Sequence, residues 1–306
     1  VVEEGSFTGA SNQLNLTQSA VSHRIKQLEE ITGVNLINRT TRYIKITEEG
    51  ERLYNQSRLN LAEIERTLSS IQSSSDSPLS VTTISSLATK WLLPMLAPYN
   101  QQFPNQPLSV LTDDKITDLK YEGIDAGIRL TDKIDPSVHM TFISEEWVFP
   151  VASPALLHNE LVTQKQVQQR FDQFMKQPQL LFNYPWLLDV VAEKGDDESS
   201  WRGWLKSQNM QLPESRIEQN FDRSDIALQA AAAGQGIAIA RASLVQTDML
   251  TMKLFRQVGR AVKMKYSYYF VCPNHKAEDP VIVNLRQWLK KELKESIDQV
   301  KKHLIV

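Results

Sequence analysis

The chain has 306 residues, of which 41% are hydrophobic and 23% are charged, and its formal net charge at pH 7 is -2. A chain of this length and composition is long enough for two or three domains with hydrophobic cores. No apolar run approaches the roughly 20 residues of a membrane-spanning helix, and no signal-peptide pattern is present. We therefore expect a soluble, cytoplasmic protein.

Cysteine and histidine usage gives no sign of a reactive centre. Cys272 is the single cysteine and lies in the apolar run FVCP, so we expect a buried strand residue rather than a redox sensor. The five histidines are scattered along the chain, which predicts no metal site. Neither a G-x-S-x-G motif nor Walker-type glycines are present, so the sequence does not favour an enzyme.

Residues 5–26, GSFTGASNQLNLTQSAVSHRIK, predict two short helices with a tight turn at Asn15 and Leu16. The hydroxyls of Ser6 and Thr17 can cap the two helices. Apolar side chains at steps of three and four predict their inward faces. These inward residues are Phe7, Ala10 and Leu14 on the first helix and Ala20, Val21, Ile25 and Leu28 on the second.

The outward face of the second helix carries amides, hydroxyls, an imidazole and a cation, without a carboxylate before Glu29. Its side chains are Gln18, Ser19, Ser22, His23 and Lys26. Such groups can bind base edges and phosphates in the major groove of DNA. An ordinary solvated face of a small helical bundle gives the same periodicity and remains the alternative.

Residues 36–39 and 43–47 are short β-rich runs that predict a hairpin with a basic tip. Arg39, Arg42 and Lys45 make this region locally basic, and local charge determines affinity for phosphate. We therefore expect DNA-binding side chains at Thr17, Gln18, Ser19, Ser22, His23, Lys26, Arg39 and Arg42.

Thr47, followed by Glu48 and Glu49, predicts the start of a long helix that runs to about residue 71. Apolar residues then recur at steps of three and four, as in a coiled-coil seam. The seam contains Leu53, Ser57, Leu61, Ile64, Leu68 and Ile71. We expect dimerisation through this seam, and packing against the chain's own second domain is the alternative. The serine-rich residues 73–78 predict a hinge.

From residue 79 onward, short strand patterns alternate with helical patterns, which predicts α/β architecture with parallel strands and crossover helices. The predicted strands are LSVTTI, PLSVLT, IDAGIRL, HMTFIS, EEWVFPVAS, a run beginning at QLLF, RIEQNF, GIAIA and KYSYYFVCP. The predicted helices are SSLATKWLLPMLAPYNQQF, DKITDLKYEG, residues 154–175, SDIALQAAAAGQG and residues 281–304.

Two groups of motifs resemble the LysR-type transcriptional regulators. They are TQSAVSHRIKQLEEITGVNLINRT with ITEEG, and WLLP, YEGIDAGIRL, FPVASP and ALQAAAAGQGIAIA. The chain is similar to the subgroup of glycine-cleavage activators through its Ile-Arg strand end and the pair Trp201 and Trp204. Residues 162–200 depart from the family pattern as an insertion. The resemblance also implies a helix before Val1 that packs on Phe7 and Leu14, so we expect a truncated N-terminus.

The resemblance implies a domain order. It predicts a winged helix-turn-helix domain in residues 1–47, a linker and dimerisation helix in 48–72, a hinge in 73–78 and an effector-binding domain in 79–306. That last domain is expected to be two-lobed and similar to periplasmic solute-binding proteins. Lobe I would comprise residues 79–147 and 266–306, and lobe II residues 148–265.

The implied function is regulation of transcription, in which a small metabolite between the two lobes changes the binding of an operator. The implied partners are double-stranded DNA with a pseudo-palindromic operator, a second copy or three further copies of the chain, and RNA polymerase. No cofactor other than the effector is expected. A solute-binding α/β module or an enzyme without DNA function is the alternative.

Ligands of open α/β sheets bind beyond the carboxyl ends of the strands. This rule predicts effector contacts at Ser85, Ser86, Leu87, Thr112, Arg129, Leu130, Thr131, Phe149 and Asp222. The Arg129 guanidinium can pair with a carboxylate, which favours a small anion or a zwitterion such as an amino acid. Helix capping by the serines, and an internal salt bridge between Arg129 and Asp113, are the alternatives.

Overall fold

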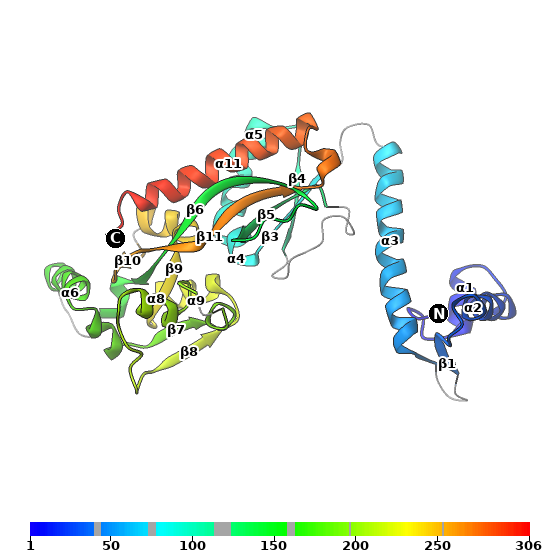
Figure 1. The fold of residues 1–306 in the computed structure, drawn as a ribbon, viewed down its shortest axis with the longest axis horizontal. Coiled ribbons are helices and arrows are strands. Elements are labelled where there is room, and N and C mark those ends of the chain that lie inside the picture. The colour runs from blue at the N-terminus through cyan, green and yellow to red at the C-terminus, as the bar shows by residue number, and fades with distance from the viewer. Residues whose placement is uncertain (40–43, 73–77, 113–123, 158–162, 196, 253) are drawn as a thin grey trace. The chain divides into compact units, whose positions relative to one another are not determined.

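The computed structural model describes residues 1–39, 44–72, 78–112, 124–157, 163–195, 197–252 and 254–306. These residues fall into an N-terminal unit, up to residue 72, and a C-terminal unit, from residue 78 (Figure 1). The hinge predicted over 73–78 lies outside the described residues except for residue 78. The helix predicted at DKITDLKYEG lies entirely outside them.

The N-terminal unit contains three helices and a hairpin in its described part. They are α1 (Phe7–Gln13), α2 (Gln18–Thr32), β1 (Ile37–Arg39), β2 (Ile44–Ile46) and α3 (Glu48–Gln72). The Ser6 hydroxyl caps α1 by accepting the Gly9 N–H at 2.9 Å. The Thr17 hydroxyl caps α2 by accepting the Ala20 N–H at 3.2 Å. Both helices therefore begin where the capping residues predict.

Two of the predicted inward residues of this unit are wrong. Leu14 is 60% exposed and Leu28 is 38% exposed. Leu14 lies one residue beyond the end of α1, so the helical period that predicted its face no longer applies there. Leu28 lines an open surface groove with Ile25 and Leu53 instead of the buried core.

The C-terminal unit is built on one mixed sheet (Figure 1). Its described strands are β3 (Leu79–Thr83), β4 (Leu108–Thr112), β5 (Ala126–Thr131), β6 (His139–Ala152), β7 (Trp186–Asp189), β8 (Glu218–Phe221), β9 (Ile237–Arg241), β10 (Arg256–Gln257) and β11 (Val262–Cys272). The order is β4-β3-β5-β11-β6-β9-β7-β8, and β10 pairs with β6. Strand β3 pairs in parallel with β4 and β5, and β7 pairs in parallel with β8 and β9. Two parallel lobes are thus joined by the long antiparallel strands β6 and β11, which confirms the predicted two-lobed α/β fold class.

The ladder between β6 and β11 is interrupted where the two lobes meet. Its register shifts between the pairs that contain Lys263 and Ser267, and again between those of Tyr268 and Tyr269. On one side of the first shift β6 pairs with β9, and on the other side β11 pairs with β5. The two predicted strands HMTFIS and EEWVFPVAS are one continuous strand, β6, that crosses this junction.

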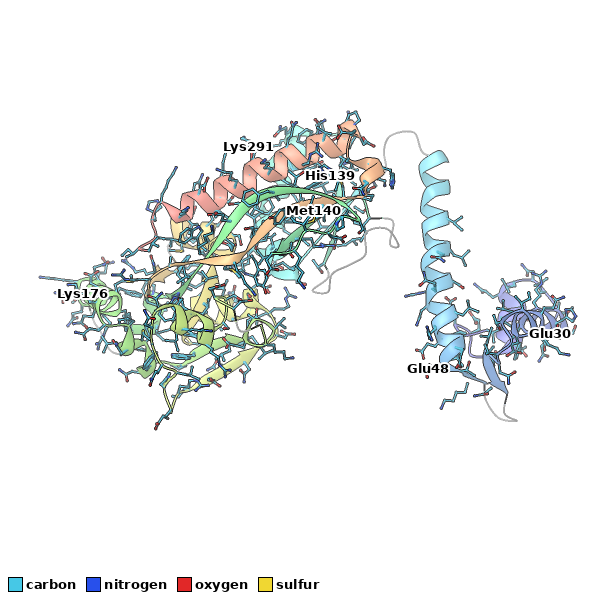
Figure 2. The ribbon with its side chains drawn as sticks, in the orientation of Figure 1. Glu30, Glu48, His139, Met140, Lys176 and Lys291 are labelled. Atoms are coloured by element: carbon cyan, nitrogen blue, oxygen red, sulfur yellow. The ribbon has the colours of Figure 1, made fainter. Side chains whose placement is uncertain are left out.

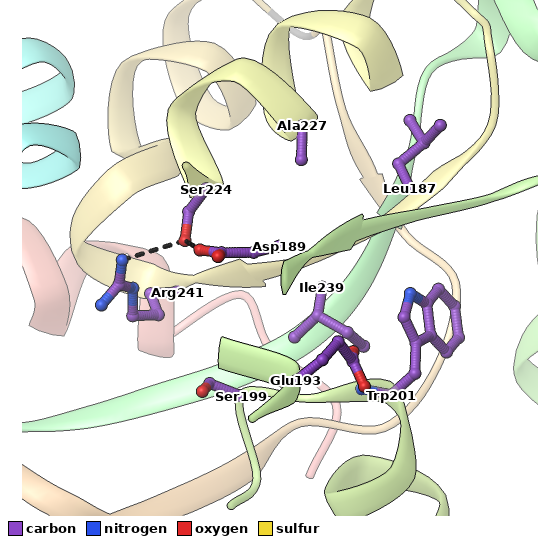
Figure 3. Close-up of a pocket in the computed structure, with 9 residues that line it drawn as sticks. All are labelled: Leu187, Asp189, Glu193, Ser199, Trp201, Ser224, Ala227, Ile239 and Arg241. Atoms are coloured by element: carbon purple, nitrogen blue, oxygen red, sulfur yellow. Dashed lines mark hydrogen bonds between the residues drawn. The ribbon is translucent and has the colours of Figure 1, made fainter. Parts of the chain in front are cut away.

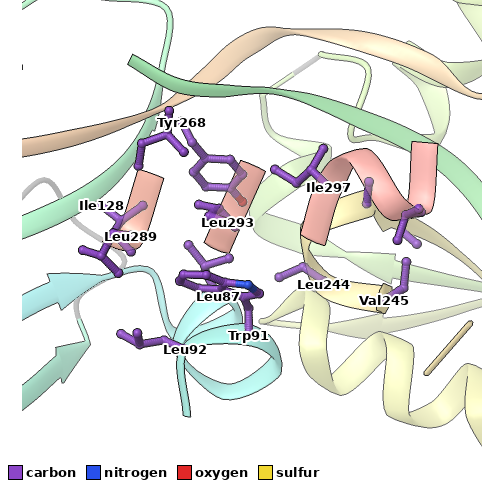
Figure 4. Packing of buried hydrophobic residues seen from close by; sticks show 14 of the residues in the cluster. Leu87, Trp91, Leu92, Ile128, Leu244, Val245, Tyr268, Leu289, Leu293 and Ile297 are labelled. Carbon is purple, nitrogen blue, oxygen red and sulfur yellow. The ribbon is translucent and has the colours of Figure 1, made fainter. Parts of the chain in front are cut away.

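Helices of the first lobe and the C-terminal helix cover a large buried core (Figure 4). These helices are α4 (Ser85–Leu87), the π-helical turn Ala88–Leu92, α5 (Leu93–Gln102), α10 (Ala242–Gln246) and α11 (Pro280–Lys301). Leu87 and Trp91 pack in the same cluster as Leu244 and Val245 of α10. Helix α10 therefore packs with the core of the first lobe, although its sequence position follows a strand of the second.

The second lobe has its own aromatic core. Its helices are α6 (Gln164–Lys176), α7 (Val190–Glu193), α8 (Trp201–Ser207) and α9 (Ser224–Ala232). The Trp186 and Trp201 rings stack at 4.2 Å with 10° between their planes, and Trp204 meets Trp201 edge-on at 6.0 Å. Helix α6, from the stretch predicted to be an insertion, contributes Phe171 and Phe174 to this core.

The strand predicted to begin at QLLF is wrong, because residues 178–183 form a 3-10 helix and β7 begins only at Trp186. Short apolar runs do not distinguish strands from buried helical turns. Further short helical turns lie at Pro154–Leu157, Thr247–Thr251 and Asn274–Lys276.

In the remaining elements, most charged side chains lie on the surface and most apolar side chains lie inside, as expected for a globular unit. Lys176 of α6 and Lys291 of α11 are exposed (Figure 2). Cys272 at the end of β11 is fully buried, and burial raises the pKa of its thiol. No helix among the described residues is long and apolar enough to cross a membrane.

Candidate functional site

The exposed face of α2 brings together most of the predicted DNA-binding residues. Thr17, Gln18, Ser19, His23 and Lys26 are exposed, and Ser22 is half-buried. The Lys26 ammonium lies 3.9 Å from the Glu30 carboxylate, and these side chains are 71% and 64% exposed. A pair this exposed contributes little, so Lys26 can exchange Glu30 for a phosphate. The Arg39 side chain and all of Arg42 lie outside the described residues.

The position of α2 relative to the hairpin is fixed by polar contacts. The Glu29 carboxylate accepts the backbone N–H of Leu36 at 2.9 Å and of Ile37 at 3.2 Å. The Thr47 hydroxyl donates to the Asn35 carbonyl at 2.8 Å and accepts the Gly50 N–H at 3.0 Å. These bonds hold the last turn of α2, the hairpin and the first turn of α3 together. The exposed face of α2 is therefore presented on a fixed support.

A second candidate site is a cavity of about 250 Å³ between the two lobes of the C-terminal unit. The first lobe and the crossing strand β11 line it with Ile84, Ser86, Leu130, Met264 and Tyr266. The second lobe lines it with Asp189, Val191, Ala192, Gly195, Asp197, Ser199, Asp222, Arg223, Ser224 and Arg241. Three of the predicted effector residues, Ser86, Leu130 and Asp222, are thus among its walls.

Arg241 is the centre of this cavity and connects the two lobes. It ends β9, and its Nη2 donates to the Ser86 hydroxyl of the first lobe at 2.9 Å. The same nitrogen donates to the Ser224 hydroxyl at 3.1 Å, and Ser224 donates to the Asp189 carboxylate at the end of β7 (Figure 3). Both hydrogen bonds of the guanidinium with described residues use Nη2, which leaves the N–H groups on Nε and Nη1 for a ligand.

Arg223 also lines the cavity, but its charge is engaged. Its Nε and Nη2 bind the Asp225 carboxylate at 3.0 and 2.5 Å. A longer contact of 3.4 Å joins Nη2 to the Thr89 hydroxyl of the first lobe. Arg241 is therefore the cation of the cavity wall for which no ion pair with a described residue is found, and the carboxylates of Asp189, Asp197 and Asp222 line the same cavity.

A buried carboxylate lies behind Arg241 on the crossing strand β6. Glu146 is 0% exposed and accepts the N–H of Trp147 at 2.8 Å and of Ser243 at 3.4 Å. Burial raises the pKa of Glu146, while the Ser243 hydrogen bonds and the Arg241 charge lower it by less. The Tyr268 hydroxyl, 3.0 Å from the Ser243 hydroxyl, completes this polar cluster.

The remaining predicted effector residues do not line the cavity. Leu87 and Phe149 are 0% exposed in the core, because their side chains point away from the inter-lobe space. Arg129 directs Nη1 toward the carbonyls of Thr82 and Ile128, each at 3.4 Å. Asp113, its alternative salt-bridge partner, lies outside the described residues. Ser85, Thr112 and Thr131 also lie outside the walls of the cavity.

Asp189 and Arg241 are functional candidates that sequence reasoning missed. Each is the last residue of a strand, so the rule that selected Ser86 and Asp222 applies to them too. Arg241 directly follows GIAIA, and Asp189 follows the apolar run WLL. The incorrect strand prediction at QLLF concealed Asp189, because it placed the end of that strand too early.

Comparison with known families assigns both units. Residues 1–51 match the family model described as bacterial regulatory helix-turn-helix protein, lysR family. Residues 72–294 match the model described as LysR substrate binding domain, which covers more than half of the chain. The chain belongs to the LysR family. Proteins of this family bind DNA and respond to a ligand, so the chain is a transcriptional regulator and not an enzyme.

Individual relatives agree with the family. This LysR-type chain is 30% identical to the HTH-type transcriptional regulator DsdC of Escherichia coli (strain K12), over 94% of this chain and 89% of that protein. It is 28% identical to the glycine cleavage system transcriptional activator of the same strain, over 93% and 88%. These identities do not separate one subgroup from the other. The AmpR effector binding domain from Citrobacter freundii has the same fold, with a TM-score of 0.53 and 21% identity over 71% of this chain and 98% of that domain.

Proposed function

We propose that this LysR-type regulator acts in the cytoplasm as a homodimer, or as a homotetramer of two such dimers, on a pseudo-palindromic operator. Its effector is a small zwitterion that binds between the lobes, and no other cofactor takes part. The regulator also acts on RNA polymerase as a partner. The observation that carries the proposal is Arg241, which joins the two lobes at the cavity while presenting donors to it.

The exposed seam of α3 supports the dimer. Leu61 is 58% exposed and Ile64 is 55% exposed, three residues apart on one side of the helix. Apolar side chains repeated along one face of a long helix are stabilised by packing against a second helix. Two copies paired in this way carry two α2 faces, and two-fold symmetry requires half-sites that are inverted copies of each other.

The charges of the inter-lobe cavity support a zwitterion. A carboxylate can take the Nε and Nη1 donors of Arg241 together with the hydroxyl of Ser86. Two arginines line the cavity, and Arg223 is already paired with Asp225. The three carboxylates of Asp189, Asp197 and Asp222 therefore outnumber the single positive charge of Arg241. An ammonium group on the same ligand compensates these negative charges. The cavity volume of about 250 Å³ restricts the ligand to a small metabolite.

The same arrangement explains how the ligand changes the regulator. Arg241 donates a hydrogen bond to Ser86 across the two lobes. A carboxylate that recruits both groups changes the distance at which the lobes are held. Only a ligand that binds one lobe arrangement more tightly than the other shifts their populations.

The test is a thermal-shift screen of the full chain with the proteinogenic amino acids, followed by titration of the best probe into wild type and Arg241→Gln. We expect Arg241→Gln to weaken binding of that probe about 100-fold, because a charged bidentate contact is lost. Affinity for operator DNA without the probe should be unchanged.

Arg260→Gln is the matched control, since it removes an exposed arginine outside the cavity. Equal probe affinity in wild type and Arg241→Gln would remove Arg241 from the site. A screen in which no zwitterion raises the melting temperature would contradict the ligand class.

A further inference from the structure

A second, smaller cavity opens off the inter-lobe cavity into the second lobe (Figure 3). The two cavities share Asp189, Ser199, Ser224 and Arg241 as walls, so they are contiguous. Its other walls are Leu187, Glu193, Trp201, Ala227 and Ile239. The volume of about 10 Å³ is that of a single water-sized group.

The indole of Trp201 presents an unpaired donor to this cavity. Trp201 is 1% exposed, and its Nε1 has no hydrogen-bond partner among the described residues. The neighbouring tryptophans differ, because Trp186 donates to the Leu181 carbonyl at 3.1 Å and Trp204 to the Arg260 carbonyl at 2.9 Å. A buried donor without an acceptor is unfavourable, so the Trp201 N–H is a candidate contact for a ligand group or a water molecule.

The Trp201 ring is held in place, so its N–H cannot turn to another partner. The ring stacks on Trp186 at 4.2 Å, and its backbone N–H donates to the Glu193 carboxylate at 2.7 Å. The nitrogen lies on the edge of the indole that faces the other residues of the cavity (Figure 3).

The charges around the small cavity restrict what can enter it. Glu193 and Asp189 place carboxylates in its wall, and burial raises the pKa of Glu193. Arg241 is also a wall of this cavity, but it is shared with the inter-lobe cavity, where it can hold a ligand carboxylate. Glu193 lines only the small cavity and would repel a carboxylate there. An ammonium group would be attracted, but it has no lone pair to accept the Trp201 N–H. A hydroxyl oxygen can accept from Trp201 and donate to a carboxylate at the same time.

We propose that the small cavity is a subsite for one hydroxyl oxygen, supplied by the effector or by a water molecule, that accepts from Trp201 Nε1 and donates to Glu193. This inference rests on the proposed effector site and adds a specificity determinant to it. A short zwitterion whose hydroxyl reaches the subsite displaces the water. A zwitterion with a larger branch in that position is rejected by the volume of about 10 Å³.

The test is calorimetric titration of the full chain with alanine and serine, in both enantiomers, because these probes differ by one hydroxyl. If the effector supplies the oxygen, wild type should prefer one serine enantiomer over the matching alanine by about tenfold. Trp201→Phe keeps a stacking ring and should remove this preference, so that serine and alanine bind the variant with similar affinity. Trp204→Phe is the matched control and should keep the preference, since its N–H bonds outside the cavity.

Crystals of the full chain, grown with and without the probes, separate the two sources of the oxygen. A water about 3 Å from Trp201 Nε1 is expected without ligand, and either the same water or the serine hydroxyl with ligand. An empty cavity in both crystals overturns the subsite, as does a serine preference that survives both Trp201→Phe and Glu193→Gln. If neither probe binds, serine and alanine are excluded as effectors. The electron density at Trp201 Nε1 still tests whether the subsite holds a hydroxyl oxygen.

Discussion

Glu146 combines complete burial with a position beside the residue that links the lobes. The Ser243 side chain, the backbone N–H groups of Trp147 and Ser243 and the charge of Arg241 only partly offset its loss of hydration. Its protonated form is therefore favoured in the folded state relative to the unfolded chain. A carboxyl group in this situation destabilises the fold as it ionises.

Stability should consequently fall with rising pH because of Glu146. The folded pKa lies above the ordinary value of 4.5, so the favourable contribution is present below that value and is lost as pH rises through the folded pKa. Glu146→Gln cannot ionise, so its unfolding free energy relative to wild type should increase as pH rises from below 4.5 through the folded pKa. Chemical denaturation at several pH values measures this difference.

The control for that comparison is Glu145→Gln, on the same strand but with a side chain that is 42% exposed and paired with Lys263. Its stability difference from wild type should be small at every pH, as expected for an exposed ion pair. A Glu146→Gln difference that stays constant or shrinks as pH rises would contradict the assigned direction.

Residues at strand ends were the part of the site that the sequence could reveal. Ser86 and Asp222 were found because each follows a recognisable strand, and the same rule applied to GIAIA would have found Arg241. The unpaired Trp201 donor could not be predicted, since it depends on where the Trp186 ring and the Leu181 carbonyl lie in three dimensions. Side-chain direction likewise separates Leu87, in the core, from its neighbour Ser86, in the cavity.

Among the elements, the first turn of α3 packs closely against the start of the hairpin. Gly50 lies against the backbone of Leu36, and a Cβ at this position would be 2.1 Å from the Leu36 carbonyl oxygen. The same turn accepts and donates hydrogen bonds through Thr47. The hairpin and α3 can keep this separation only with glycine at position 50.

Gly50→Ala should destabilise the N-terminal unit by about 3 kcal/mol, because the clash is with backbone that cannot rotate away. We expect loss of operator binding at a temperature at which the C-terminal unit still binds its effector. Circular dichroism melting and operator titration measure the two effects. Asn55→Ala, exposed on the same helix, should change neither. An unaltered melting curve for Gly50→Ala would mean that α3 moves away from Leu36 at little cost.

The sequence predicted elements best where a long period or a cap marks them. Helices α2 and α3 and strand β9 follow from their spacing and from Thr17 and Thr47. The 3-10 helix Pro178–Asn183 did not, because a short apolar run fits several structures and its partner is the distant aromatic core. The bonds from Glu29 to Leu36 and Ile37 also join separate elements, so no local pattern contains them.

At the scale of the whole molecule, the proposed function depends on two α2 faces acting together. When two copies pair through α3, binding of the first α2 face to its half-site holds the second α2 face near the other half-site. The affinity of the dimer for the operator is therefore higher than that of one copy, although each copy makes the same contacts. Leu61 and Ile64 are exposed apolar side chains of the predicted seam, so substitutions at these two positions should disrupt the pairing.

The double substitution Leu61→Glu and Ile64→Glu should halve the molecular mass in sedimentation analysis and weaken operator binding by at least about 100-fold. Binding to a single half-site should change little, because the α2 face is untouched. Asn55→Glu adds a negative charge away from the seam and serves as the control. A double variant that keeps both its mass and its operator affinity would place the dimer interface elsewhere.

The ladder between β6 and β11 is interrupted where the two lobes of the C-terminal unit meet, and we expect the lobes to move relative to each other at this point. Met264 and Tyr266 fall inside the interruption and also form part of the cavity wall, so the proposed effector would contact this segment. Because no register pair is formed at residues 264–266, we expect a rotation of the lobes about this point to break few hydrogen bonds of the ladder. We then expect a few side chains to determine the effector concentration at which the protein responds. A single substitution at the Arg241–Ser86 contact would change this concentration while the fold is kept.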